Sequence, residues 1–572
     1  MKKLLKYLKP YVKEAVLGPL FKLFEATLEL IVPLVIASII DIGISGENKG
    51  YVLFMCLVLA LLGIVGFVFS ITAQFFAAKA SVGFVTGMKR GLYSHLQELS
   101  YSDIDGLGTS TMITRMTADS SKVQTGLNLT LRLLLRSPFV VFGAMIMALS
   151  IDADAGINFL LVIILLSVIV FGIMLITMPM YKNVQSGVDK ILNKTRENLS
   201  GVRVIRAFGM EDKEVGDFNK SNTTLASAQK KAGNISALMN PLTYVIINLG
   251  ILILINQGAI RVDNGILTQG QVIALYNYML QILVELIKMA NLIVSISKAL
   301  ASASRIASVF DLKPSQIYGE VDAGLDCDNA VEFRNVNLRY GASSENSLEQ
   351  ISFSVKKGET IGIIGGPGAG KSSLINLIPR FYDASEGEVI LDGVNVKKYS
   401  KKALIGKIGI VPQRAVLFSG SIRDNIKWGK KDATDEEIMS AIEISQAKDI
   451  LHAKGGLDAK IEAGGKNLSG GQRQRLTIAR ALVGNPDIVI LDDSASALDY
   501  ATDAALRSAI KNLPNNQTVF IVSQRASSVM HADKIVVLDD GKITGIGTHD
   551  ELIKSNAVYK EIYDSQFDKE VS

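Results

Sequence analysis

Long apolar blocks alternate with polar stretches over about the first 300 residues of the chain. Six of these blocks approach the ~20 residues that an α-helix needs to cross a bilayer. They run over 16–42, 52–78, 130–151, 157–181, 236–257 and 270–297. One such block would also suit a buried helix of a soluble protein. Six in succession predict a polytopic α-helical membrane domain with six transmembrane helices.

Basic residues are concentrated in every second connection between the blocks. They cluster before the first block and recur through the two long connections, 79–129 and 182–235. The three short connections together hold only Lys49 and Arg261. Because positive charge stays on the cytoplasmic side, both termini are predicted to be cytoplasmic, in a cell (inner) membrane that the chain crosses several times.

The two long connections are polar and mostly helical in pattern, so we expect them to extend the membrane helices below the bilayer. Polar and glycine-containing stretches near Asp103–Thr109 and Gly209–Asp217 are the expected tips. Residues 1–14 are predicted to form an amphipathic helix on the inner membrane surface.

The pattern changes from about residue 331 to short β-type runs that alternate with helical stretches. The runs are Val331–Phe333, Thr360–Ile364, Ile408–Val411, Ile488–Leu491, Thr518–Val522 and Lys534–Leu538. This alternation predicts an α/β domain with a largely parallel sheet. We therefore expect a transmembrane domain over 1–315, a linker over 316–330 and an α/β domain over 331–572.

Composition narrows the class of protein further. Charged residues make up 20% of the chain and hydrophobic residues 48%, whereas an ordinary soluble domain has about 25% charged residues. The 60 basic and 55 acidic residues nearly balance, so we expect no nucleic-acid partner. The two cysteines, Cys56 and Cys327, lie far apart in the sequence and exclude a disulfide-rich secreted scaffold.

One glycine-rich stretch fits the phosphate-binding pattern GxxxxGK[ST]. Its residues are Gly365, Gly366, Pro367, Gly368, Ala369, Gly370, Lys371 and Ser372. The stretch follows an apolar run and precedes a helical pattern from Ser373, which is the context that a phosphate loop requires. The loop amides would surround the phosphates of ATP, Lys371 would neutralise the β- and γ-phosphates, and the Ser372 hydroxyl would ligate Mg²⁺.

A second motif is the apolar run Ile488–Leu491 that ends in Asp492. A strand with this ending places a carboxylate beside the phosphate loop, where the carboxylate holds Mg²⁺ through water. By itself an Asp at a strand end only supports the assignment, because such turns are common.

The stretch Leu468–Gln472 reads LSGGQ and lies 97 residues after Lys371. Here the chain resembles the ATP-binding cassette (ABC) family, whose signature has this sequence. In the order of the family's motifs, Tyr340 resembles the aromatic residue that stacks on adenine. Gln413 resembles the glutamine that contacts Mg²⁺ and senses the membrane domain, and Asp499 resembles the aspartate of the loop that crosses the dimer interface.

Six membrane helices followed by one cassette resemble an ABC exporter half-transporter, which implies that 331–572 is an ABC nucleotide-binding domain. In that family two cassettes bind ATP head to tail, and the tips of the long connections act as coupling helices. The resemblance therefore implies a dimer with a second half-transporter. The residues that would reach the other chain's ATP are Ser469, Gly470, Gly471, Gln472 and Asp499.

Two positions depart from the family pattern. The residue after Asp492 is normally the glutamate that polarises the attacking water, and here it is Asp493, which is one methylene shorter. The position of the family's switch histidine holds Gln524, which cannot carry a proton charge. We expect ATP binding with slow hydrolysis at this chain's own site. The intact LSGGQ would then serve a partner that carries Glu and His, as in heterodimeric bacterial multidrug exporters.

Three ionisable residues within the apolar blocks are candidates for substrate contacts: Glu29, Glu285 and Lys288. Glu285 and Lys288 are three residues apart and can equally form a mutual ion pair on one helix face. Glu29 lies close enough to the end of its block to extend its carboxylate to the interface. The favoured substrate is a small amphiphilic compound such as a drug or dye, moved out of the cell.

Other functions remain open at this stage. The chain can be read as a homodimeric lipid or peptide exporter, or as a regulatory or channel-like ABC protein that ATP binding gates. The short outer connections and the compact linker favour the transport ATPase, because the sequence between the two halves contains no regulatory insertion.

Overall fold

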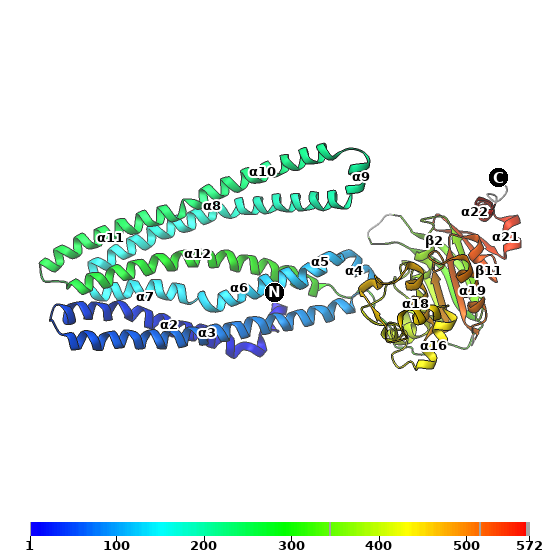
Figure 1. The fold of residues 1–572 in the computed structure, drawn as a ribbon, viewed down its shortest axis with the longest axis horizontal. Helices are drawn as coiled ribbons and strands as arrows, with labels where there is room; N and C mark the ends of the chain where they lie inside the picture. Colours follow the sequence, from blue (N-terminus) through cyan, green and yellow to red (C-terminus); the bar gives the residue numbers. More distant parts are fainter. Residues whose placement is uncertain (1, 342–344, 514–515, 568–572) are drawn as a thin grey trace. The chain divides into compact units, whose positions relative to one another are not determined.

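A computed structural model describes residues 2–341, 345–513 and 516–567. The chain divides into two compact units (Figure 1). The first unit comprises residues 1–97 and 110–312, and the second comprises residues 98–109 and 313–572. The short segment 98–109 therefore belongs to the cassette unit, although it lies within the first half of the sequence.

The first unit consists of long helices. Within the described residues, six apolar helical stretches are long enough to cross a membrane: Lys9–Ile44, Lys49–Glu98, Thr109–Ile151, Gly156–Ser200, Glu211–Asp263 and Gln269–Asp311. Each predicted apolar block falls inside one of these stretches, which confirms the six-helix membrane domain. The helices extend well beyond the apolar blocks, as the polar connections predicted.

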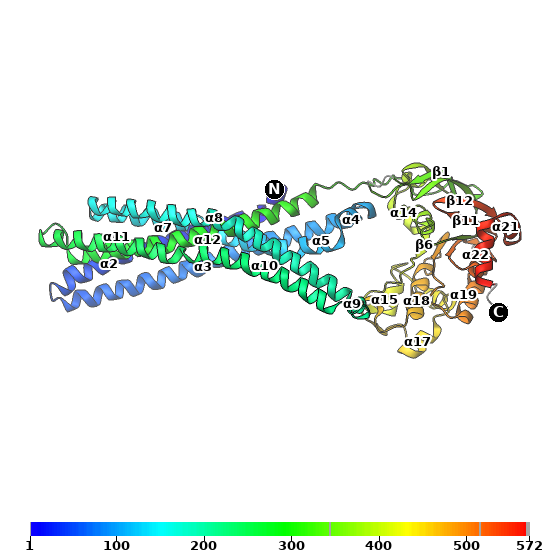
Figure 2. The ribbon, with the colours of Figure 1, turned by 90° about the horizontal axis from the view of Figure 1, so that it is seen from above.

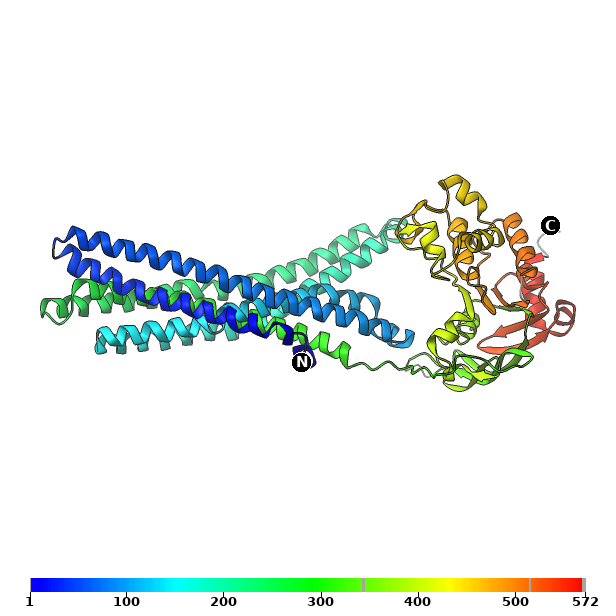
Figure 3. The same cartoon turned by 90° about the horizontal axis from the view of Figure 1, so that it is seen from below.

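The stretches are built from the following helices: α2 (Val12–Ser38), α3 (Lys49–Glu98), α5 (Thr109–Thr114), α6 (Ser120–Leu133), α7 (Arg136–Ile151), α8 (Ala153–Ser200), α10 (Glu211–Ala237), α11 (Met239–Asp263) and α12 (Gln269–Asp311). Helix α12 packs against α2, α6 and α7, while α8 packs against α10 and α11. Figures 2 and 3 show α8 and α10 running side by side to the short helix α9 (Val202–Ala207).

Two local predictions for this unit are wrong in part or in whole. The tip of the second long connection was expected near Gly209–Asp217. Gly209, with a φ of +60°, does lie in the turn between α9 and α10, but α10 already begins at Glu211, so the rest of that stretch is helical. The described residues of the segment 1–14 do not form one amphipathic helix, because α1 (Lys2–Leu5) is short and α2 begins only at Val12. Instead the segment packs on protein, with Leu4 buried and the Tyr7 ring 6.0 Å from that of Phe310.

The second unit is an α/β fold built around a six-stranded sheet in the order β12-β11-β3-β10-β9-β6. Its strands are β3 (Thr360–Gly365), β6 (Ile408–Val411), β9 (Ile488–Asp492), β10 (Thr518–Ser523), β11 (Lys534–Asp539) and β12 (Lys542–Gly547). Neighbouring strands are parallel except β12, which pairs antiparallel with β11. The predicted runs coincide with five of these strands because a parallel strand that is buried on both faces is apolar throughout.

The unit also contains a second, antiparallel sheet, which the sequence patterns did not predict. It has the order β2-β1-β4-β5, with β1 (Asn329–Leu338), β2 (Leu348–Lys356), β4 (Glu386–Leu391) and β5 (Val394–Asn395). The predicted run Val331–Phe333 lies in β1 and therefore belongs to this sheet. Buried and exposed residues mix along β2 and β4, so their apolar signal is weaker than that of a parallel strand.

Helices and a small hairpin complete the second unit. The hairpin pairs β7 (Gly420–Ser421) with β8 (Lys460–Ile461). The helices are α4 (Tyr101–Leu107), α13 (Lys371–Ile375), α14 (Lys401–Gly406), α15 (Ile422–Ile426), α16 (Asp435–Ile444), α17 (Lys448–Lys454), α18 (Gly470–Leu482), α19 (Tyr500–Lys511), α20 (Ala526–Val529), α21 (His549–Ser555) and α22 (Ala557–Phe567). One apolar core lies between the two sheets, around Phe333, Ile361 and Phe520, and a second lies against α16 and α18.

Helices α6 and α12 approach closely at Gly126, where a Cβ would lie 2.1 Å from the Cβ of Ala299. We expect Gly126→Ala to lower the free energy of unfolding by about 1–3 kcal/mol, because overpacking outweighs the helix propensity of alanine. Gly63→Ala is the matched control, since a Cβ there would meet no atom within 4 Å. Thermal unfolding of the full chain in detergent measures both, and equal stability of the two variants would contradict the close packing.

Candidate nucleotide-binding site

The candidate site lies at the edge where the parallel strands of the large sheet end. Strand β3 leads into the loop 365–370, β9 ends at Asp492, and β6 and β10 end just before Gln413 and Gln524. The register aligns these ends, because β10 pairs Val522 with Asp492 and Ser523 with Ile364. Ligands in open α/β folds bind outside the carboxyl ends of the strands, so the fold itself brings these residues together.

The loop has room for a ligand on its open side. Gly368 and Gly370 have φ values of +82° and +94°, a region that a side chain with a Cβ rarely adopts. A Cβ added at Gly366 or Gly368 would meet no atom within 4 Å. Small residues therefore keep this side of the loop clear, so that its backbone can approach a phosphate closely.

Lys371 is held by its own loop. Its Nζ donates hydrogen bonds to the carbonyl oxygens of Gly365 (2.8 Å) and Gly366 (2.7 Å). Burial lowers the pKa of the Lys371 ammonium, against the opposing effect of the nearby Asp493 and Asp492 charges. Because neither carboxylate forms a direct ion pair with Lys371 among the described residues, an anion above the loop would supply the counter-charge that burial demands.

Ser372 and Asp492 are in direct contact, since the Ser372 hydroxyl donates to both carboxylate oxygens, at 3.0 and 3.2 Å. Burial is the main cause that raises the pKa of Asp492, and the Asp493 charge adds to it. A hydroxyl and a carboxylate are the hard oxygen ligands that Mg²⁺ prefers. No group of three or more His, Cys, Asp or Glu side chains that could bind a metal alone occurs in the described part of the chain. A cation at Ser372 and Asp492 would thus also need phosphate oxygens, which fits Mg²⁺ bound with a nucleotide.

One cavity of about 390 Å³ collects most of the predicted residues. Its lining includes Pro367, Gly368, Ala369, Gly370, Lys371, Ser372, Ser373, Gln413, Asp492, Asp493 and Gln524. Asn346, Ser347, Asp540 and Gly541 line it too and were missed in the sequence. Asp-Gly between two β-type runs is a hairpin signal that could have identified the last two. This turn lies against the phosphate loop, because the Gly541 amide donates to the carbonyl of Ala369 (3.3 Å).

Asp493 has little freedom in its backbone. Its φ is +47°, its amide donates to the carbonyl of Val522 (2.9 Å), and its own carbonyl accepts from the Ser496 hydroxyl (2.9 Å). With the main chain held on both sides, the position of the carboxylate depends on the length of the side chain. Gln524 is exposed at the next strand end, and its backbone carbonyl accepts from the amide side chain of Gln566 (2.8 Å).

Tyr340 does not line this cavity. Its hydroxyl donates to Ser373 (3.0 Å), and its ring meets that of Tyr382 edge-on, with the centroids 4.9 Å apart. Burial raises the pKa of Tyr340. Its predicted stacking on adenine remains a prediction.

The signature residues do not line this cavity either. Ser469 is the N-cap of α18 and forms a reciprocal pair with Gln472, and Gly470 and Gly471 form the first turn of the helix. Asp499 caps α19 by accepting from the Thr502 amide (2.9 Å). Ser469, Gly470 and Asp499 are exposed, which leaves this end of α18 accessible to a second molecule.

The three ionisable candidates of the membrane unit share one ion-pair cluster. Glu29 and Glu285 both pair with Arg136, and Lys288 pairs with Glu285. Arg136 lies in the third apolar block and was not among the predicted site residues. Glu285 and Lys288 do form the mutual pair (2.9 Å). The Glu29 carboxylate pairs with Arg136, whereas the sequence suggested that it extends unpaired to the membrane interface.

Comparison with known proteins gives two family matches, "ABC transporter transmembrane region" over residues 16–286 and "ABC transporter" over residues 348–496. The chain is 35% identical to "Uncharacterized ABC transporter ATP-binding protein YfiB" of Bacillus subtilis (strain 168), over the full length of both. It is 31% identical to "Putative multidrug export ATP-binding/permease protein YgaD" of the same organism, covering 99% of each chain. It is 29% identical to "ATP-dependent lipid A-core flippase" of Haemophilus influenzae (strain 86-028NP), covering 99% of this chain and 97% of the relative.

A solved structure titled "Structure of a bacterial Atm1-family ABC exporter with ATP bound" has the same fold, with a TM-score of 0.80. The two chains are 23% identical, and the match covers 98% of each. This similarity extends through both the helical and the α/β unit.

The raised pKa of Asp492 predicts the outcome of Asp492→Asn. A buried carboxylate whose pKa is raised destabilises the fold while it is ionised, so the neutral amide should stabilise the nucleotide-free chain at pH 7 by on the order of 1 kcal/mol. The difference from the wild type should shrink as the pH falls toward that pKa, because the wild-type carboxyl then becomes neutral. Thermal unfolding of the full chain at several pH values measures this.

The same variant should lose the stabilisation that Mg²⁺ and ATP together give the wild type, since the cation loses a charged ligand. If Mg²⁺ and ATP stabilise the Asp492→Asn variant as much as the wild type, the assignment of the cation to Ser372 and Asp492 is contradicted.

Proposed function

Because this chain belongs to the ABC transporter family and is an exporter half-transporter, we propose that it forms one subunit of a heterodimeric, ATP-driven exporter of amphiphilic compounds. The proposal includes a transmembrane domain over 1–315, a linker over 316–330 and a nucleotide-binding domain over 331–572. One observation carries it: Asp493 and Gln524 line the cavity that otherwise holds the family's ATP-binding residues.

In this proposal the chain's own residues bind ATP and Mg²⁺. The loop amides and Lys371 hold the phosphates, and Lys371 exchanges its two carbonyl partners for phosphate oxygens. Ser372, Asp492 and Gln413 hold Mg²⁺, which supplies positive charge to the phosphates during the reaction. Tyr340 stacks on adenine after turning its ring away from Tyr382. These residue types are unchanged from the family pattern, so we infer that binding is intact.

Hydrolysis is the impaired step. A general base must come within hydrogen-bond distance of the water that it polarises. The Asp493 carboxylate is one methylene too short, and the bonds to Val522 and Ser496 hold its backbone in place. A misplacement of about 1 Å can cost on the order of 10²-fold in rate. Gln524 can donate a hydrogen bond to the γ-phosphate but, unlike a histidine, it adds no positive charge there.

The intact LSGGQ signature would then act in the partner's ATP site. Ser469 and the first amides of α18 are exposed and form an anion-binding helix start, which suits the phosphates of an ATP bound to the other chain. A competent site would combine this signature with a partner that carries Glu and His at its hydrolytic positions. The chain thus contributes to hydrolysis in the partner's site, while its own site hydrolyses ATP only slowly.

Helix α4 supports the link between ATP use and transport. The Tyr101 ring stacks on Phe381 with the centroids 4.6 Å apart, and the Asp105 carboxylate accepts from the Tyr382 hydroxyl (2.7 Å). The amide of Ser315 also donates to the Asp103 carboxylate (3.0 Å). A segment that connects two membrane helices is therefore anchored on the cassette. In this role α4 transmits cassette motion, and α9, with its exposed neighbour Phe208, does the same on the partner.

The substrate class rests on relatives and on charge. One relative is named a putative multidrug export protein and another a lipid A-core flippase, and both names point to amphiphilic cargo. The distribution of basic residues favours cytoplasmic termini, so that ATP is used on the inside. The direction that we propose is export across the cell (inner) membrane.

The test is ATPase activity of the purified chain in lipid, alone and with a half-transporter that carries Glu and His. We expect weak activity alone and activity about 10²-fold higher together. Replacing the partner's Glu by Gln should abolish the activity of the pair, whereas Asp493→Asn in this chain should change it less than twofold.

Full turnover by the chain alone would contradict the heterodimer and make Asp493 a competent base of a homodimeric exporter. Turnover by the pair without any stimulation by amphiphilic compounds would instead favour a regulatory or channel-like role.

A further inference from the structure

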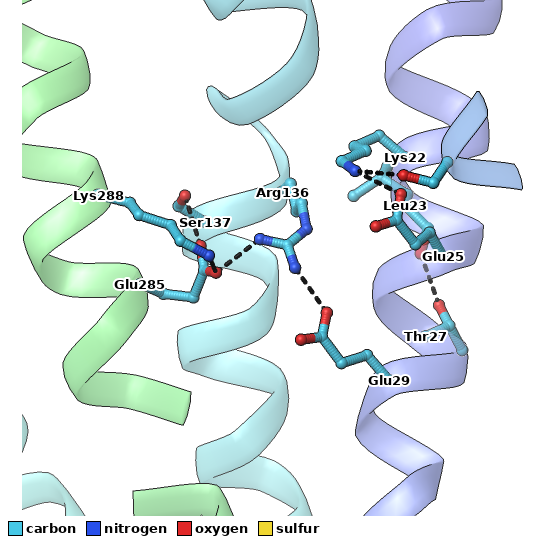
Figure 4. Close-up of polar contacts among 10 residues, drawn as sticks. Lys22, Leu23, Glu25, Thr27, Glu29, Arg136, Ser137, Glu285 and Lys288 are labelled. Carbon is cyan, nitrogen blue, oxygen red and sulfur yellow. Dashed lines mark hydrogen bonds and ion pairs between the residues drawn. The ribbon is translucent and has the colours of Figure 1, made fainter. Parts of the chain in front are cut away.

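Arg136 is the centre of a charged cluster inside the membrane unit (Figure 4). It is the first residue of α7, and only 7% of its side chain is exposed. One terminal nitrogen donates to Glu285 on α12 and the other to Glu29 on α2, both at 2.6 Å. A single guanidinium therefore joins three membrane helices, and its Nε has no hydrogen-bond partner among the described residues.

The cluster is neutral but open at both ends. Glu285 is buried and also accepts from Ser137 (2.8 Å) and Lys288 (2.9 Å). Two carboxylates, Glu29 and Glu285, thus balance two cations, Arg136 and Lys288. The terminal members are half-exposed, with 42% of the Glu29 side chain and 44% of the Lys288 side chain accessible. Because one guanidinium and one carboxylate connect them, these two ends lie within about 10 Å of each other.

Two of the membrane helices carry local irregularities near the cluster. Helix α6 ends at Leu133 and α7 begins at Arg136, but Leu134 and Leu135 between them keep helical φ and ψ angles, so this crossing is one helical stretch with a local irregularity beside the cluster. In α2, Pro33 has no amide hydrogen to donate to the carbonyl of Glu29. Next to it, the carbonyl of Leu30 accepts from the buried Tyr278 hydroxyl (2.6 Å).

The apolar interior of the bilayer also constrains where the exposed charges can lie. Ionisable side chains within membrane helices almost always face the interior of a bundle or a hydrated cavity, because exposure to lipid chains is too costly. The accessible ends of Glu29 and Lys288 therefore face a passage or a partner chain. Lys22 and Glu25 lie on α2 beside the cluster in Figure 4. They form an ion pair with each other, so they do not change the net charge of the cluster.

We propose that this cluster binds the headgroup of a zwitterionic amphiphile, with the cationic group at Glu29 and the anionic group at Lys288. The inference rests on the export function proposed above and specifies its substrate. A neutral site in a medium of low dielectric constant favours a ligand whose charges cancel, since a singly charged headgroup would leave an unbalanced charge. Arg136 and Glu285 position the two terminal side chains.

Direct binding to the nucleotide-free full chain, in uncharged maltoside micelles, tests the proposal. The probes are three fluorescent single-chain amphiphiles of equal chain length, with phosphocholine, trimethylammonium or sulfate headgroups. The wild type should bind the phosphocholine compound at least about tenfold more tightly than either singly charged one. Glu29→Gln leaves the cluster net positive and should shift the preference to the sulfate. Lys288→Gln leaves it net negative and should shift the preference to trimethylammonium.

Glu47→Gln and Lys298→Gln remove the same charges from exposed positions outside the cluster and should keep the wild-type order. Equal binding of the three headgroups by the wild type, or an unchanged order in both cluster variants, would overturn the proposal. If a variant does not yield monodisperse protein, the proposal is still tested on the wild type, by its order of headgroup affinities and by displacement of the bound probe with an unlabelled phosphocholine amphiphile.

The source of the zwitterion is distinguished in nanodiscs of uncharged glycolipid. Displacement of the probe by added diacyl phosphocholine lipid indicates a bilayer lipid as the ligand, and displacement only by the single-chain compound indicates a dissolved amphiphile. Binding requires no nucleotide, so selective binding without ATP-dependent transport would contradict the export function while leaving the headgroup site in place.

Discussion

Two buried charges of opposite sign lie at one edge of the parallel sheet without pairing with each other. Lys371 is bonded to carbonyls of its own loop and Asp492 to a serine hydroxyl, and burial shifts the pKa of each toward its neutral form. A phosphate beside the lysine and a divalent cation beside the aspartate would supply both missing counter-charges. The cassette is thus arranged so that Mg²⁺ and a nucleotide would complete it.

Charge compensation governs the membrane unit as well, but here the chain supplies both signs. Arg136 and Glu285 neutralise each other in the interior, and the balancing charges, Glu29 and Lys288, remain accessible at the ends. A fully buried cluster would only hold α2, α7 and α12 together. In the proposal above, these accessible ends bind the two opposite charges of a zwitterionic headgroup.

Much of the fold could be predicted because its signals are local. The membrane helices and the parallel strands are continuous apolar runs, and the phosphate loop is a contiguous motif. The antiparallel sheet was missed because β2 and β4 mix buried with exposed residues. Arg136 was missed because its partners are 107 and 149 residues away in the sequence, so that nothing near it indicates a pair. The assignment of α4 to the cassette also depends on contacts across more than 200 residues.

The central claim is that ATP bound at this chain's loop persists because Asp493 and Gln524 replace stronger hydrolytic groups. Single-turnover hydrolysis of labelled ATP by the purified chain in lipid tests this most directly, comparing the wild type with the double variant Asp493→Glu/Gln524→His. The account predicts that the wild type retains ATP and that the double variant cleaves it about 10²-fold faster. Rapid cleavage by the wild type, or equally slow cleavage by both proteins, would contradict it.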